Sequence, residues 1–163
     1  MKSPNMKSSL ALFFQVFIVL IGIGILGFLL WEPHLEGRNA HATTFEIYFT
    51  DSFLAYVYVG SIPFFVALYR AFKMFGQVRQ NRSFSPAALD DLRAIKRCAI
   101  ALIGFVAGGV IIILKNGDPD DRPAGFFMGL LVALTAGAIA TAATMFARKL
   151  RSALGDGNGR VVS

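Results

Sequence analysis

Side chains that could hold a metal ion or transfer protons gather in two short connections of the sequence. The first connection begins with two glutamates and two histidines close together, Glu32, His34, Glu36 and His41. Their spacing matches no zinc-binding signature, and a hydrated segment with such residues is most often only a polar loop. We therefore predict no metal site in this connection.

The second connection carries three acidic residues, Asp118, Asp120 and Asp121. They resemble part of a calcium-binding loop, but the glutamate that closes an EF-hand loop is missing, and the two prolines nearby favour a tight turn. The chain has one cysteine, Cys98, which excludes an intrachain disulfide and a paired-cysteine redox site. We predict no metal and no cofactor.

Motifs for catalysis are absent as well. The sequence contains no Ser-His-Asp or Cys-His arrangement, no phosphate-binding glycine loop and no HExxH. We therefore expect the protein not to be an enzyme, and we name no catalytic residue. A membrane enzyme acting on lipid is only the third of our hypotheses, after the two given at the end of this section, because no nucleophile or base can be named.

The composition is that of a membrane protein. Of 163 residues, 55 % are hydrophobic and 16 % are charged, against roughly 25 % charged residues in soluble domains. A soluble fold of this size could not bury so much apolar surface, since most of its residues would touch water.

Four stretches of 17 to 24 residues contain no Asp, Glu, Lys, Arg or His, and they cover residues 10–31, 52–69, 98–114 and 124–147. About 20 apolar residues cross the hydrocarbon core as a helix, which pairs its own backbone groups. We predict an all-α fold, a four-helix transmembrane bundle. It forms one integral membrane domain over residues 1–163, with helices at about 10–31, 49–75, 86–114 and 124–150 and a flexible tail at 151–163. The absence of ionisable residues within these stretches disfavours an ion-coupled carrier.

Most basic residues lie in the segments that the predicted helices place on one side of the membrane. Thirteen of the sixteen Lys and Arg lie at the amino terminus, in the central connection and in the tail. Since cytoplasmic loops of membrane proteins carry this excess, both termini and the central connection are predicted to be cytoplasmic. The net charge of +6 is then a topology signal, and we expect no direct binding of nucleic acid.

Small residues mark the predicted packing surfaces of the last two helices. The predicted packing residues are five glycines, Gly104, Gly108, Gly125, Gly129 and Gly137. Glycines at this spacing let helix backbones approach closely. Packing within one chain is the first interpretation, and a homodimer contact or a mobile helix are the alternatives.

The first two helices carry a few polar groups. Pro63 removes one backbone hydrogen bond and predicts a kink. The hydroxyls of Tyr56, Tyr58 and Ser61 lie in the same helix, and Gln15 is the most polar side chain of the first. They either form a small polar pocket or, as we favour, ordinary hydrogen bonds between helices.

The central connection predicts a helix start. Ser85 is a good N-cap with Pro86 in the first helical position, and Asp90 and Asp91 suit the first turns because of the helix dipole. Its basic residues either dock a partner or rest on lipid phosphates. The predicted partner-binding residues are Arg79, Arg82, Arg93, Lys96 and Arg97.

The central connection reads Phe84-Ser85-Pro86, followed by Leu92-Arg93-Ala94-Ile95 and a glycine-bearing third helix. With these residues in a four-helix layout, the chain resembles the bacterial DUF2975 family of small membrane proteins. This resemblance implies a bacterial inner-membrane location, no established activity, and a small helix-turn-helix regulator as a partner. Many members end in an acidic and hydrophobic tail, whereas this chain has a basic stretch at 148–151 followed by glycines.

Our leading hypothesis is a non-enzymatic accessory or regulatory protein of the plasma membrane. Its partners would be the lipid bilayer and a cytosolic regulatory protein that binds the basic central connection. The alternative is a small uncoupled channel or exporter formed by a homodimer, with Thr135, Thr141 and Thr144 along its path.

Overall fold

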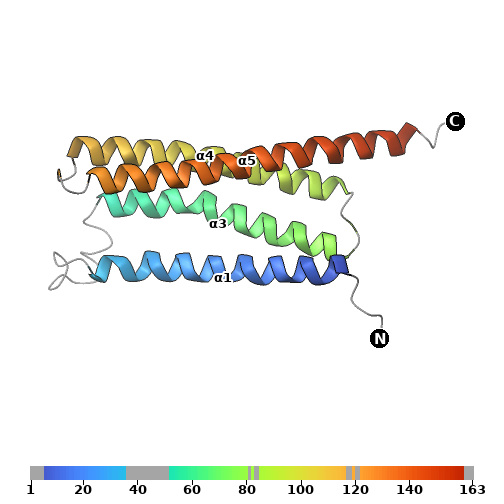
Figure 1. The fold of residues 1–163 in the computed structure, drawn as a ribbon, viewed down its shortest axis with the longest axis horizontal. Helices are drawn as coiled ribbons and strands as arrows, with labels where there is room; N and C mark the ends of the chain where they lie inside the picture. Colours follow the sequence, from blue (N-terminus) through green and yellow to red (C-terminus); the bar gives the residue numbers. More distant parts are fainter. Residues whose placement is uncertain are drawn as a thin grey trace.

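The computed structural model describes residues 6–35, 52–80, 82, 85–116, 119 and 122–159. In these ranges it contains four long helices, α1 (Met6–Leu35), α3 (Ser52–Arg79), α4 (Pro86–Asn116) and α5 (Arg122–Gly159) (Figure 1). All four are long and apolar enough to cross a membrane. The predicted all-α class with four apolar spans is therefore confirmed.

Each helix continues beyond the charge-free stretch that predicted it. Lys, Arg and Gln at these ends are good helix formers, and their long side chains reach the head groups while the backbone stays helical. Pro63 lies inside α3 without ending it. The predicted start of the second helix at residue 49 lies outside the described ranges, which omit residues 36–51.

The carboxyl end of α5 corrects the prediction of a flexible tail from residue 151. The helix continues through Gly159, and residues 160–163 lie outside the described part of the chain. The physical reason is packing, because Leu150 is buried in the core cluster and Leu154 packs against that cluster. The glycines of this segment suggested flexibility, but the leucines before them hold the helix in place.

The helices run antiparallel to their neighbours in the chain. Helix α3 packs against α1 on one side and against α4 on the other, and α4 packs against α5. Figure 1 shows α3 between α1 and the α4–α5 pair, with α5 projecting furthest at its carboxyl end. The start of α1, the end of α3, the start of α4 and the end of α5 therefore lie at one end of the molecule (Figure 1), which we call the basic end.

A buried core cluster lies at the basic end. A cluster of small and branched side chains from α4 and α5 is buried there: Ala88, Leu92, Ile95, Ala143 and Leu150. Residues of α3, Ala71 and Met74, pack against it. By contrast, most large apolar side chains of α1 are exposed, including Phe13 and Ile23, as expected for a helix with lipid around it.

The predicted packing glycines divide into two groups. A Cβ atom added to Gly108 would meet the Tyr56 hydroxyl, one added to Gly125 would lie 2.9 Å from Ile113 Cδ1, and one added to Gly129 would meet Val110. These three glycines thus lie at close helix contacts.

Gly104 and Gly137 lie differently, because no described atom of a neighbouring helix lies within 4 Å of a Cβ added to either one. Among the described residues, neither glycine therefore lies at a close helix contact. Gly109, which the spacing argument passed over, is buried and lies against the Tyr56 ring at α3. The contact of α4 with Tyr56 of α3 therefore includes Gly109 as well as the predicted Gly108.

Candidate functional site: a polar cluster and a basic groove at one end of the bundle

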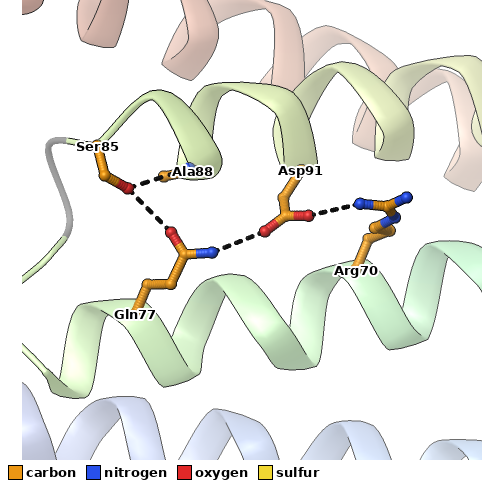
Figure 2. Close-up of polar contacts among 5 residues, drawn as sticks. All are labelled: Arg70, Gln77, Ser85, Ala88 and Asp91. Carbon is orange, nitrogen blue, oxygen red and sulfur yellow. Dashed lines mark hydrogen bonds and ion pairs between the residues drawn. The ribbon is translucent and has the colours of Figure 1, made fainter.

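The start of α4 is fixed by a chain of hydrogen bonds that reaches α3 (Figure 2). The Ser85 hydroxyl accepts a hydrogen bond from the backbone N–H of Ala88 at 3.2 Å, which confirms Ser85 as the N-cap. The same hydroxyl donates to Gln77 Oε1 at 3.0 Å. The cap therefore serves two purposes, since it begins one helix and binds the side chain of another.

Asp91 is the centre of this cluster. Its carboxylate accepts a hydrogen bond from Gln77 Nε2 at 2.8 Å and forms an ion pair with Arg70 Nη1 at 3.0 Å (Figure 2). The Asp91 side chain is 1 % exposed, whereas that of Arg70 is 38 % exposed. A buried carboxylate is costly unless it is paired and hydrogen-bonded, and here both of its oxygens have a partner.

The cluster was missed by sequence reasoning, which assigned Asp91 only to the helix dipole. A signal was nevertheless present in the spacing. Ala88, Leu92 and Ile95 form the buried stripe of α4, and Asp91 lies within that stripe at three residues from the first. An acidic residue on the apolar face of a helix indicates a partner on the neighbouring helix, here Arg70 and Gln77.

A second polar contact joins α1 to α3. Gln15 is 7 % exposed, and its Nε2 donates to the backbone carbonyl of Phe72 at 3.2 Å. Arg79 Nη1 donates to Gln15 Oε1 at 3.4 Å. The predicted role of Gln15 in a hydrogen bond between helices is confirmed, and Arg79 takes part in the same contact.

A groove of about 170 Å³ lies between the start of α4 and the end of α5. Four basic side chains line it, Arg93 and Lys96 from α4 and Arg148 and Arg151 from α5. Thr144 of α5 also lines it, and the apolar lining comes from two leucines of α4 and two alanines of α5, Leu89, Leu92, Ala143 and Ala147. The antiparallel packing brings these two basic stretches together, although some fifty residues separate them in the sequence.

The groove divides the five predicted partner-binding residues. Arg93 and Lys96 line it, while Arg79 bonds to Gln15 and belongs to the α1–α3 contact. Arg82 and Arg97 are exposed and outside the groove. The structure thus separates two basic surfaces that the sequence presents as one.

The opposite half of the molecule contains an apolar cavity of about 410 Å³, lined by residues of all four helices. Tyr56 at its edge donates a hydrogen bond to the Phe105 carbonyl of α4 at 2.7 Å, and Tyr58 donates to the Leu29 carbonyl of α1 at 2.7 Å. Ser61 donates to the Tyr58 carbonyl of its own helix. The predicted bonding between helices is therefore found for both tyrosines, and Ser61 also lines the cavity.

The other chemistry-bearing residues contribute little to a site. In the described ranges no group of three or more His, Cys, Asp or Glu could hold a metal ion. Glu36, His41, Asp118, Asp120 and Asp121 lie outside these ranges, and of Glu32 and His34 only the backbone is described. Cys98 is a half-buried free thiol. The hydroxyls of Thr135, Thr141 and Thr144 donate to carbonyls of their own helix.

Comparison with known proteins agrees with the resemblance seen in the sequence. The family model described as "Protein of unknown function (DUF2975)" matches residues 10–156. The chain is 31 % identical over 144 residues to the uncharacterized membrane protein YoaS of Bacillus subtilis (strain 168), which covers 88 % of this chain and 90 % of that protein. No solved structure matches significantly. The similarity therefore concerns a multi-pass membrane protein along nearly its whole length.

Proposed function

The chain belongs to the DUF2975 family, and from this premise we propose that it is a non-enzymatic accessory or regulatory protein of the bacterial plasma membrane. In this proposal the basic end faces the cytoplasm, as the distribution of Lys and Arg favours. A cytosolic protein binds there to the connection between α3 and α4. A small helix-turn-helix regulator is the partner that the family resemblance suggests.

The observation that carries the proposal is the way this connection is held. The backbone N–H of Arg82 donates to the Gln77 carbonyl at 2.9 Å, and the Gln77 side chain bonds to both Ser85 and Asp91. The Arg82 and Arg97 side chains are exposed, Arg82 in the connection and Arg97 further along α4. Basic side chains on a backbone that hydrogen bonds hold at Arg82 and at the start of α4 lose little conformational entropy when they bind an acidic partner.

Affinity purification of the full chain from native membranes tests the proposal. We expect a soluble protein to copurify with the wild-type chain and to be lost from the double variant Arg82→Glu, Arg97→Glu. The matched control is Lys115→Glu, since Lys115 is an exposed cation at the opposite end of α4. Recovery of no soluble protein, or equal recovery with both variants, would contradict the proposal.

A homodimeric channel or exporter is the second candidate, and one observation favours it. Gly104 and Gly137 leave small-residue surfaces that no neighbouring helix within the described part of the chain covers. Surfaces of this kind allow close contact between membrane helices. In this case Gly137→Leu abolishes both dimerisation and flux in reconstituted vesicles, whereas an unchanged oligomeric state in lipid argues against it.

A further inference from the structure

The groove between α4 and α5 brings together four basic side chains from two helices, Arg93, Lys96, Arg148 and Arg151. In the described part of the chain, Lys96, Arg148 and Arg151 have no carboxylate within ion-pair distance. Arg93 pairs with Asp90 at 3.4 Å, but this pair is exposed, with 46 % and 70 % of the two side chains accessible. An exposed pair of this kind is weak and can be replaced by a stronger anion.

The four cations give the groove a concentrated positive charge. Three of them, Arg93, Arg148 and Arg151, are exposed, so solvent screens their mutual repulsion, and an anion placed between them gains attraction from each. Since α4 and α5 pack closely along this segment, with Leu92 and Ala143 buried beneath the groove, the arrangement fits a bound anionic group. Guanidinium groups suit phosphate in particular, because they can donate two parallel hydrogen bonds.

The position of the groove along the helices identifies the source of the phosphate. The charge-free stretches end at residues 98 and 147, so the groove begins where the apolar part of α4 and α5 stops. This is the depth of lipid head groups. Further along the same two helices, Ile100 and Ile139 are exposed apolar side chains on which acyl chains can lie.

We propose that the α4–α5 groove is a binding site for an anionic phospholipid, whose phosphate contacts Arg93 and Lys96 from one helix and Arg148 and Arg151 from the other. The apolar lining of Leu89, Leu92, Ala143 and Ala147 receives the start of the acyl chains. Such a lipid stabilises the α4–α5 contact at the basic end. The site is independent of the proposed protein partner, which binds through Arg82 and Arg97.

Native mass spectrometry of the full chain, released from detergent micelles with added lipid, tests this site. The probes are phosphatidylglycerol, phosphatidylcholine and diacylglycerol with identical acyl chains. We expect phosphatidylglycerol to be retained on the order of tenfold more than either other lipid, because a net negative phosphate attracts each nearby Lys or Arg. Equal retention of the three lipids would overturn the proposal.

Two variants with the same charge change locate the site. Arg148→Gln with Arg151→Gln should reduce retention of phosphatidylglycerol on the order of tenfold. Lys73→Gln with Lys149→Gln should leave it unchanged, because these two lysines are exposed at the basic end and do not line the groove. The same loss in both double variants would show a general surface attraction and would overturn the groove as the site.

Two further measurements keep the result interpretable. If the α5 variant does not fold, Arg93→Gln with Lys96→Gln removes the α4 half of the same groove and is expected to give the same loss. Inorganic phosphate at millimolar concentration is the second probe. We expect it not to displace phosphatidylglycerol, and complete displacement would show that the groove binds free phosphate and not the lipid.

Discussion

The two ends of this membrane protein are built in different ways. At the basic end, an ion pair and a series of hydrogen bonds join α3 to α4, and small side chains pack α4 closely against α5. In the opposite half, an apolar cavity of about 410 Å³ lies between all four helices, and tyrosine hydroxyls bond to backbone carbonyls of the neighbouring helices. Polar contacts between helices depend on particular residues, whereas apolar packing around a cavity can adjust. The basic end is therefore the part of the molecule that defines one arrangement of α3, α4 and α5.

Removal of Asp91 should have the largest effect on stability. Asp91→Ala leaves Arg70 and Gln77 without their partner and opens a gap in the buried stripe of α4. We expect a loss of about 3 kcal/mol in the free energy of unfolding, the low end for breaking a buried pair, because Arg70 is 38 % exposed and reaches water. Unfolding by SDS in mixed micelles, followed by circular dichroism, measures this loss.

The neighbouring residue provides the control. The Asp90 side chain is 70 % exposed and forms an ion pair with Arg93 at 3.4 Å. Asp90→Ala should change the free energy of unfolding by less than about 0.5 kcal/mol, as is usual for an exposed pair within a helix. Similar losses for Asp90→Ala and Asp91→Ala would contradict the distinction between the two residues.

Overpacking of the opposite half should cause the next largest loss of stability. In Gly129→Leu the new side chain meets Val110, whose β-branched side chain has few alternative rotamers. We expect a loss of about 2 kcal/mol in the free energy of unfolding, measured in the same micelles.

Gly137→Leu on the same helix is the matched substitution, since nothing described lies within 4 Å of its added Cβ. It should leave the free energy of unfolding within about 0.5 kcal/mol of the wild type. A large loss that depends on protein concentration would instead place Gly137 in a contact between two copies, and would favour the homodimer.

Removal of a single tyrosine hydroxyl should cause the smallest loss of stability. Tyr56→Phe removes the 2.7 Å hydrogen bond to the Phe105 carbonyl and keeps the ring in place. Hydrogen bonds between membrane helices average about 0.6 kcal/mol, and we expect a loss of this size. Tyr69→Phe is the control because the Tyr69 side chain is 64 % exposed, and a loss above about 2 kcal/mol at Tyr56 would mean that the opposite half also depends on polar contacts.

The sequence predicts the membrane spans well, because the requirement for about 20 apolar residues acts on each helix separately. The start of α4 at Ser85 and Pro86 follows in the same way from local capping chemistry. The end of α5 was placed too early, since its stability comes from contacts of Leu150 and Leu154 with other parts of the chain. Local composition does not record such contacts.

The sites are less predictable than the spans because they combine residues from several helices. The partners of Asp91 lie 14 and 21 residues away, on another helix. The groove joins the residues near 93 to those near 148. Predicting it requires knowing that α4 and α5 are neighbours and which face each helix turns toward the other. For the same reason the glycine spacing of α4 indicated Gly104 and Gly108, whereas in the structure Gly108 and the unpredicted Gly109 lie against Tyr56.

Photocrosslinking in intact cells tests most directly the claim that the basic end is the functional end. A photoreactive residue replaces Arg82 in one variant and Lys115, at the opposite end of α4, in the other; both positions are exposed. We predict that Arg82 yields an adduct with a soluble protein that mass spectrometry identifies, and that Lys115 yields none. Adducts with lipid or with a second copy alone, or the same soluble proteins from both positions, would contradict the account.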